Sequence, residues 1–311
     1  MSDATNGENV GRPAPGGTFL LAGRATARIG YGMGQVTRKA AAPAGRENAY
    51  AVLRHAFDLG ITHYDTAQFY GNGLANELLR DAFGPQRDDI LIATKAGAKP
   101  VPGAPIPLKA AQKPSELRDA VEANLRTLRT DRIDIVNLRR MDYTPGLLAE
   151  GDQVVPLDDQ LAELSALRDE GKILGIGLSH ITLDQLRAAL PVGVVCVQNI
   201  YNVIDRSDEA LLALCAENGI AWIPYFPLGG GFGALPAVGE NTEVQAVASR
   251  LGATASQVGL AWQLTHSANT MLISGTSSIE HLDENSAGAT ITLDPHSLAT
   301  LDKIGSTTPR D

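Results

Sequence analysis

Short apolar runs alternate along the chain with longer stretches whose apolar residues recur at the spacing of a helix. The runs that we expect to be strands cover residues 28–31, 61–65, 90–94, 133–138, 173–178, 194–198, 221–226 and 270–274. Helical periodicity with helix-start residues is clear at 115–128 and 157–168. This alternation predicts parallel strands joined by helical crossovers. Eight such units favour an α/β fold of the closed (β/α)8 TIM barrel type over an open doubly wound sheet.

No linker or shift in composition divides the chain, so residues 19–311 are predicted to form a single barrel domain. Residues 1–18 are rich in Gly, Pro, Asn and Ala and lack the basic start and apolar core of a secretory signal, so we expect a mobile N-terminal tail. Gly- and Pro-rich segments at 96–114 and 227–240 each follow a predicted strand. Such loops surround the mouth of a barrel, where we expect them to shape the substrate and cofactor site.

Charge and composition argue against several classes of partner. The chain has 35 acidic and 26 basic residues, a net charge of −9, and no basic block with interleaved aromatic residues, which argues against a nucleic-acid partner. No uncharged apolar run approaches the ~20 residues of a membrane span. Cys196 and Cys215 lie in apolar surroundings and are predicted to be buried thiols of a reducing compartment, so we expect a cytoplasmic protein. A monomer or weak homo-oligomer is expected.

Polar residues end most of the predicted strands. A parallel barrel gathers these ends around one mouth, and a polar cluster there is costly to desolvate unless it has a role. Each residue alone is explained as well by a hydrogen bond to a loop, but together they predict a site. The strand-end residues are Asp65, Lys95, Arg139, Ser179, His180, Gln198, Asn199, Tyr225 and Ser274.

Three residues suggest a reaction. A tyrosine is a poor acid at neutral pH, but an adjacent ammonium stabilises its phenolate and lowers its pKa. Tyr70 beside Lys95 is therefore expected to give a proton to a carbonyl oxygen as hydride reaches the carbon. Asp65 is expected to keep Lys95 charged despite burial. The alternative is an ion pair that joins two strands beside a packed tyrosine.

Four motifs, spread from about residue 28 to 304, resemble the aldo-keto reductase superfamily. They are Asp65-x4-Tyr70-Gly71, Lys95 at the end of the third strand, Glu170-Gly171-Lys172-Ile173 leading into Gly177-Leu178-Ser179, and Gly275-Thr276-Ser277-Ser278 followed by Glu284-Asn285. The resemblance implies an oxidoreductase that reduces a small aldehyde or ketone with NADP(H) by direct hydride transfer. It places Asp65, Tyr70 and Lys95 on three of the four catalytic positions, with Tyr70 as the acid.

The fourth catalytic position, usually a histidine, is Arg139 here. Strand parity puts Arg139 on the inward face with Ile135 and Asn137, and Arg140 on the other. Arginine stays protonated, so it is no titrating acid, but it can donate hydrogen bonds to a developing alkoxide or to a polar substrate group. The alternative is a surface arginine beside Arg140.

The substrate class follows from a narrower resemblance. The run Asn137-Leu138-Arg139, with Val197-Gln198-Asn199, Phe226-Pro227-Leu228-Gly229-Gly230 and residues 275–278, resembles the bacterial pyridoxal reductase subgroup. This implies reduction of pyridoxal to pyridoxine. The alternatives are a broad-specificity reductase of aromatic aldehydes and ketones, a non-catalytic nucleotide-binding redox-sensor subunit, and a barrel hydrolase with a metal on His63 and Asp65.

The resemblance also implies where the cofactor lies. Ser179, Gln198 and Tyr225 are expected near the nicotinamide, and His180 stands where the family usually has asparagine, either as a carboxamide contact or as a loop histidine without a ligand. Gly275 and His281 stand where many relatives have a lysine and an arginine near the 2′-phosphate, and the loss of two cations weakens the electrostatic preference for NADP over NAD. Thr276, Ser277 and Ser278 can still donate hydrogen bonds to a phosphate, so NADP(H) is expected and NAD(H) remains an alternative. The predicted cofactor-binding residues are Gly32, Met33, Asp65, Ser179, His180, Gln198, Tyr225, Pro227, Leu228, Gly229, Gly275, Thr276, Ser277, Ser278, His281, Glu284 and Asn285. No metal is expected.

Overall fold

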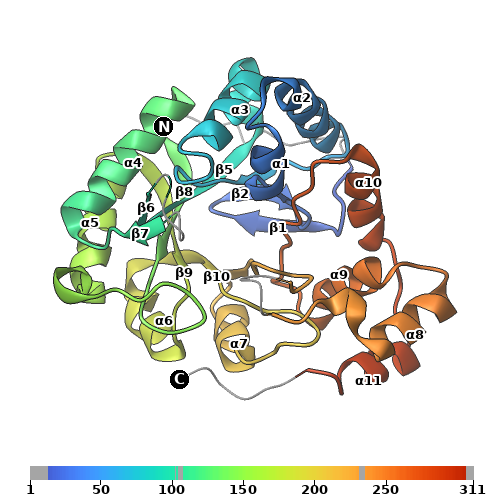
Figure 1. Cartoon of the computed structure of the whole chain (residues 1–311). Helices are drawn as coiled ribbons and strands as arrows, with labels where there is room; N and C mark the ends of the chain where they lie inside the picture. Colours follow the sequence, from blue (N-terminus) through green and yellow to red (C-terminus); the bar gives the residue numbers. More distant parts are fainter. Residues whose placement is uncertain (1–12, 102, 104–107, 231–234, 306–311) are drawn as a thin grey trace, which may run out of the picture.

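A seven-stranded parallel sheet forms the centre of the computed structural model, which describes residues 13–101, 103, 108–230 and 235–305. Its strands follow the order β11-β10-β9-β8-β5-β4-β3. In Figure 1 the helices form a ring around the strands, and the colours run once around this ring from blue to red. The strands are β3 (Tyr31–Gly32), β4 (His63–Asp65), β5 (Leu91–Ala96), β8 (Ile133–Arg139), β9 (Ile173–Ser179), β10 (Val194–Gln198) and β11 (Ala221–Trp222).

The segment around residues 270–272 closes the sheet into a barrel. Parallel bridges join Trp222 to Thr270 and Ile29 to Leu272, on the two edges of the sheet. The backbone N–H of Met271 donates to the Trp222 carbonyl at 2.8 Å, and that of Leu272 to Arg28 at 2.8 Å. The predicted (β/α)8 barrel is therefore confirmed.

The strand predicted at 221–226 ends early. Only Ala221–Trp222 is a regular strand, because Pro224 has no N–H to donate to the ladder and Phe226 adopts a left-handed φ of 53°. The N–H groups of Ile223 and Tyr225 still bond to the neighbouring strand segment, at 2.8 and 3.0 Å. The polypeptide thus leaves the barrel wall at Tyr225, which is one of the predicted site residues.

Eleven α-helices lie in the part of the chain that the structure describes, and the periodicity at 115–128 and 157–168 located two of them to within one residue. Capping follows the sequence: Thr182 and Gln185 form a reciprocal capping box at the start of α6, and Pro114 opens α4. The helices are α1 (Gly34–Lys39), α2 (Pro43–Asp58), α3 (Leu74–Phe83), α4 (Pro114–Leu128), α5 (Leu157–Asp169), α6 (Leu183–Ala189), α7 (Glu209–Glu217), α8 (Thr242–Leu251), α9 (Ala255–His266), α10 (Ile279–Gly288) and α11 (Pro295–Leu301).

Two apolar layers hold the barrel together. The larger one packs the outer faces of the strands against the helices and includes Val136 and Leu138 of β8. The smaller one fills the barrel interior, and the hairpin of β1 (Thr18–Leu21) and β2 (Arg24–Ala27) contributes the fully buried Leu21 to it. The other members of the inner layer are Leu91, Ala93, Ile135, Cys196, Ala221, Ile223, Met271 and Ile273. A packed apolar interior leaves the polar strand ends at the mouth as the place for chemistry.

The predicted N-terminal tail is only partly described, since residues 1–12 lie outside the described residues. Of the remainder, Gly17 accepts a hydrogen bond from the Arg28 N–H at 2.9 Å, and Thr18 begins β1. The boundary of the tail stays a prediction.

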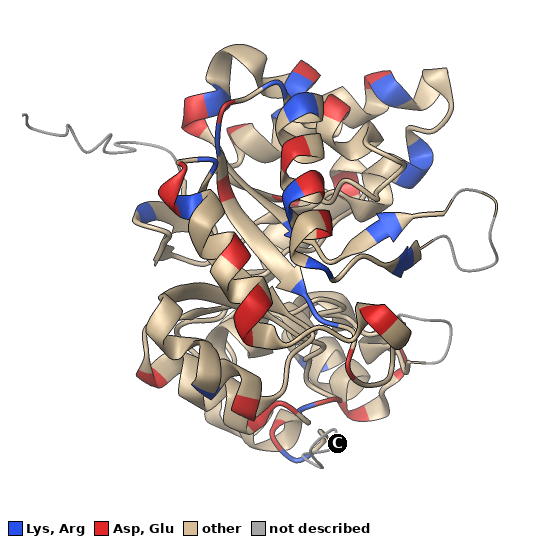
Figure 2. Ribbon diagram, turned by 90° about the vertical axis from the view of Figure 1, so that its left-hand side faces the viewer, with Lys and Arg blue, Asp and Glu red and all other residues tan. Residues whose placement is uncertain are grey.

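The Gly- and Pro-rich loop after β5 contains a short hairpin of β6 (Ala98–Pro100) and β7 (Leu108–Ala110). Figure 2 shows Lys and Arg positions interspersed with Asp and Glu positions on the helices, whereas the barrel strands carry few charges. Among the described helices, none is long and apolar enough to cross a membrane.

Candidate active site

A buried ion pair lies at the mouth of the barrel. Asp65, the last residue of β4, forms an ion pair through Oδ1 with Lys95 Nζ on β5, and Lys95 also donates to the Thr66 carbonyl at 3.1 Å. The second carboxylate oxygen of Asp65 accepts a hydrogen bond from Gln198 Nε2 at 2.7 Å. Asp65 and Lys95 are 2% and 5% exposed. Three predicted site residues from β4, β5 and β10 therefore meet at one point.

Lys95 carries its charge despite burial. Burial opposes the ammonium form, but the attraction of Asp65 and the interaction with Tyr70 outweigh this, and the pKa of Lys95 is raised above its usual value. The Lys95 Nζ lies 5.2 Å from the centroid of the Tyr70 ring. Tyr70 is half-buried, whereas Lys95 is buried. The arrangement can stabilise a phenolate.

A polar network fixes the loop that carries Tyr70. Thr66 Oγ1 donates to Asn76 Oδ1 at 2.9 Å, and Asn76 Nδ2 donates to Gln68 Oε1 and Asn124 Oδ1, both at 2.8 Å. Asn76 and Asn124 are fully buried on α3 and α4. We did not predict these supporting residues, although each is an asparagine on the apolar face of its helix and thus carried a signal.

Arg139 and Arg140 at the end of β8 point in opposite directions. Ile135 belongs to the inner apolar layer and Val136 to the outer one, so alternation sends Arg139 inward, as the strand parity predicted. Arg140 is 7% exposed and bonds to Asp142 at 2.8 Å, which is a structural role. Among the described residues Arg139 has no ion pair, and its Nε is buried without a hydrogen-bond partner. The cation at the mouth is therefore available to a ligand.

Two further buried polar atoms have no hydrogen-bond partner in the part of the chain that the structure describes. Asp65 only accepts hydrogen bonds, so Gln198 must turn its NH2 group toward it, which leaves Gln198 Oε1 as an acceptor. Neither Gln198 Oε1 nor Ser179 Oγ has a hydrogen-bond partner among the described residues. A hydroxyl donor and an amide acceptor side by side in strand register match the two halves of a carboxamide group.

His180 has partners that the sequence did not predict. Its Nδ1 lies 2.8 Å from the Tyr225 hydroxyl, and its Nε2 lies 2.9 Å from the Tyr143 carbonyl. Both ring nitrogens are thus engaged within the protein. A direct contact of His180 with the cofactor would have to share one of these nitrogens, and it stays a prediction.

Two of the predicted cofactor-binding residues, Gly32 and Gly275, meet at a close backbone approach. A Cβ at Gly275 would lie 2.0 Å from the Gly32 carbonyl oxygen, so the two loops touch only because glycine stands there. Met33 N–H donates to the Asp65 carbonyl at 2.9 Å, which joins this loop to the ion pair. Asn48 on α2, which we did not predict, donates to the Ser277 carbonyl at 2.8 Å.

The hydroxyl-rich run continues into α10. Ser278 Oγ caps the helix by accepting from the His281 N–H at 3.3 Å, and Thr276 Oγ1 accepts from the Ser278 N–H at 3.1 Å. Each hydroxyl keeps its own proton for donation to an anionic ligand. His281 and Glu284 are exposed on the helix, and Asn285 is half-buried beside them.

The backbone of the segment Pro227-Leu228-Gly229 is held by hydrogen bonds from Gln263 and Val238. Gln263 Nε2 donates to the Pro227 carbonyl at 2.7 Å, and the Val238 N–H donates to Leu228 at 3.0 Å. Gly229 has a φ of +70°, and a Cβ there would lie 2.0 Å from the Pro236 carbonyl oxygen. Residues 231–234 of this predicted loop lie outside the described residues.

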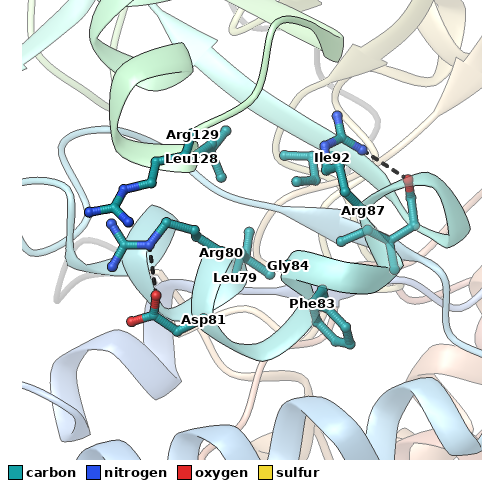
Figure 3. Close-up of a pocket in the computed structure, with 10 residues that line it drawn as sticks. Leu79, Arg80, Asp81, Phe83, Gly84, Arg87, Ile92, Leu128 and Arg129 are labelled. Atoms are coloured by element: carbon teal, nitrogen blue, oxygen red, sulfur yellow. Dashed lines mark hydrogen bonds and ion pairs between the residues drawn. The ribbon is translucent and has the colours of Figure 1, made fainter.

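A pocket of about 330 Å³ lies away from these residues. It is lined by α3, the turn after it and the end of α4, and Ile90, which precedes β5, lies at its wall. Figure 3 shows the Arg80 and Arg129 guanidinium groups side by side at one edge, with Arg80 bonded to Asp81. Because Lys95 is near the opposite end of β5, this pocket belongs to the other end of the barrel.

His63 lies two residues before Asp65 on β4. It is fully buried, neither ring nitrogen has a hydrogen-bond partner among the described residues, and burial lowers the pKa of His63 to about 4. In the residues that the structure describes, no three His, Cys, Asp or Glu side chains cluster as metal ligands. Asp65 uses both oxygens for Lys95 and Gln198, so the alternative of a metal on His63 and Asp65 loses one of its ligands.

This histidine predicts a pH effect on stability. The folded-state pKa lies below that of an unfolded histidine, near 6.5, so the stabilisation is complete above about pH 6.5 and is lost as the pH falls toward 4. We expect the free energy of unfolding to fall by about 2 kcal/mol between pH 7 and pH 5 from this group alone. Urea denaturation should show this loss in the wild type and in His281→Gln, and a smaller loss in His63→Gln. The same pH dependence in all three proteins would disprove it.

Comparison with known proteins agrees with this geometry. The sequence profile of the Aldo/keto reductase family matches residues 28–306. The chain belongs to the aldo/keto reductase family. The resemblance that the motifs predicted is thus confirmed.

Relatives of this aldo/keto reductase cover nearly its whole length. It is 41% identical to pyridoxine 4-dehydrogenase of Escherichia coli over 92% of the chain and 98% of that protein. It is 35% identical to an uncharacterized oxidoreductase of Schizosaccharomyces pombe over 93% of the chain and 90% of that protein. A crystal structure of an aldo-keto reductase from Klebsiella pneumoniae with NADPH has a TM-score of 0.75 at 27% identity, covering 94% of this chain and 95% of the other.

Proposed function

We propose that this aldo/keto reductase reduces the aldehyde of pyridoxal to pyridoxine with NADPH. The observation that carries the proposal is the buried Asp65–Lys95 pair beside Tyr70, with Arg139 at the same mouth, whose Nε has no hydrogen-bond partner among the described residues. The similarity to the Escherichia coli pyridoxine 4-dehydrogenase supports the substrate, and the Klebsiella pneumoniae structure with NADPH supports the cofactor. A monomeric or weakly associating cytoplasmic enzyme remains our expectation.

The residues at the mouth fit the cofactor. Ser179 Oγ and Gln198 Oε1 are the orphaned donor and acceptor that would hold the carboxamide, and the Tyr225 ring would lie against the nicotinamide. The hydroxyl groups of residues 276–278 and the start of α10 would hold the 2′-phosphate. When bound, NADPH supplies the hydride.

The chain's own residues move the proton. Tyr70 Oη donates its proton to the carbonyl oxygen while the carbonyl carbon receives the hydride, so the aldehyde becomes an alcohol. Lys95 stabilises the phenolate that remains on Tyr70, and Asp65 keeps Lys95 protonated and in place. Gln198 holds the second oxygen of Asp65, which links the cofactor-binding amide to the proton donor.

Arg139 gives the proposal its specificity. Pyridoxal carries a phenolic oxygen next to its aldehyde, and a fixed guanidinium is a suitable donor to that oxygen. Arg139→Met should lower kcat/KM about 10- to 100-fold for pyridoxal and for salicylaldehyde, which shares the adjacent hydroxyl. Benzaldehyde lacks this hydroxyl and should lose little. The matched control is Arg187→Met, since Arg187 is exposed on α6. Equal losses for all three aldehydes would assign Arg139 to another role.

One set of turnover rates tests the choice of cofactor and distinguishes pyridoxal reduction from the two remaining alternative functions. Steady-state turnover with pyridoxal and either NADPH or NADH should give a higher kcat/KM for NADPH, because the hydroxyl groups near α10 donate to the 2′-phosphate. Turnover only with simple aromatic aldehydes would favour the broad-specificity reductase. Tight NADPH binding without turnover of any aldehyde would favour the redox-sensor subunit.

A further inference from the structure

His180 is held in one place by its backbone and by a stacked tyrosine. It follows β9 directly with a left-handed φ of 60°, and its N–H donates to the Gln198 carbonyl at 2.9 Å. Its ring stacks on Tyr143 with the centroids 3.9 Å apart and an interplanar angle of 16°. Only 2% of the residue is exposed. The imidazole therefore has a fixed direction for its two nitrogens.

The chemistry of the two partners fixes the histidine tautomer. The Tyr143 carbonyl can only accept, so His180 Nε2 must carry the hydrogen that it shares with it at 2.9 Å. In the neutral ring Nδ1 is then an acceptor. The Tyr225 hydroxyl, 2.8 Å away, donates its hydrogen to Nδ1.

Tyr143 is itself anchored without help from any ligand. Its hydroxyl donates to the Ile181 carbonyl at 3.2 Å and accepts from Asn199 Nδ2 at 3.1 Å. Asn199 follows β10 and also donates to Asp208 at 3.0 Å. The support behind His180 is therefore built from three βα loops.

We propose that His180 is a positioning residue that fixes the Tyr225 ring for its contact with the nicotinamide; this rests on the proposed function. The backbone of Tyr225 is anchored by its N–H, which donates to the Asn199 carbonyl at 3.0 Å, and its ring makes a T-shaped contact with Phe226, with the centroids 5.4 Å apart. The bond from the Tyr225 hydroxyl to His180 further restricts the side-chain torsions. A ring already held in its binding direction loses less conformational entropy when the cofactor binds.

A double-mutant cycle on cofactor affinity tests the proposal. Tyr225→Phe and His180→Phe both keep an aromatic ring and remove the hydrogen bond between the two residues. Each should raise the Kd for NADPH, measured by fluorescence titration, about 2- to 10-fold. The double variant should be no weaker than the worse single variant, because both remove the same interaction. Multiplied losses would show that His180 acts on the cofactor independently of Tyr225 and would overturn the proposal.

A second measurement needs neither cofactor nor a substitution at His180. Nitrogen NMR of the cofactor-free protein should show one histidine with an unprotonated, hydrogen-bonded Nδ1, and this signal alone should shift in Tyr225→Phe. Tyr50→Phe is the control, since Tyr50 lies on α2 with its hydroxyl 3.3 Å from Asp81. Unchanged histidine signals in Tyr225→Phe would disprove the hydrogen bond. Because no cofactor is present, this result stands even if the wild type fails to reduce pyridoxal.

Discussion

Tyr70→Phe is expected to lower kcat for pyridoxal reduction by about 10²- to 10⁴-fold, which is the usual contribution of a positioned general acid. The substitution removes the phenolic proton and keeps the ring whose centroid lies 5.2 Å from Lys95 Nζ. The Kd for NADPH should stay within about twofold, because the lost interaction is made with the reacting carbonyl. Stopped-flow rates and fluorescence titrations give the two quantities.

The control for this variant is Tyr50→Phe, which removes a tyrosine hydroxyl outside the site. Its turnover should equal that of the wild type. Near-normal turnover in Tyr70→Phe would remove the tyrosine from the mechanism. A parallel loss of NADPH affinity would instead assign Tyr70 to cofactor binding.

Lys95→Met is expected to inactivate the enzyme and to lower the free energy of unfolding by about 3–5 kcal/mol, the cost of leaving one member of a buried ion pair without its partner. Asp65 is 2% exposed, and of the two side-chain partners that it has among the described residues it would keep Gln198 alone. The double variant Asp65→Asn/Lys95→Met removes the unpaired charge and keeps an acceptor for Gln198. It should recover much of the stability and none of the activity.

Urea denaturation measures these stabilities. The control is Lys172→Met, because Lys172 forms ion pairs with Glu122 and Glu170 but is 31% exposed in its side chain. An exposed pair of this kind contributes about 0–1 kcal/mol. Equal destabilisation by both lysine substitutions, or a double variant no more stable than Lys95→Met, would contradict the account of the buried pair.

The sequence predicted the barrel and the alternation of β8 because both depend on local periodicity. The period of two along β8 is enough to separate Ile135 from Val136, and parallel topology then brings the strand ends Asp65, Lys95 and Gln198 together. The roles assigned to the individual residues remain proposals.

The partners of His180 could not be predicted from local pattern. They depend on a left-handed φ of 60° at His180 and on Tyr143, which comes from the loop after β8. The approach of Gly32 to Gly275 joins two ends of the barrel ring that are far apart in sequence. The early end of β11 could have been predicted from the sequence, because Pro224 cannot donate a backbone hydrogen bond to the sheet. The apolar run 221–226 suggested a longer strand instead.

The most direct test of the account is the transfer of hydride from NADPH to pyridoxal. The purified protein is incubated with pyridoxal and NADPH deuterated at the transferable position of the nicotinamide, and the product is analysed by mass spectrometry. The account predicts pyridoxine with one deuterium on the new hydroxymethyl carbon, formed by the wild type and about 10²- to 10⁴-fold more slowly by Tyr70→Phe. Pyridoxal recovered unchanged, or pyridoxine without deuterium, would contradict it.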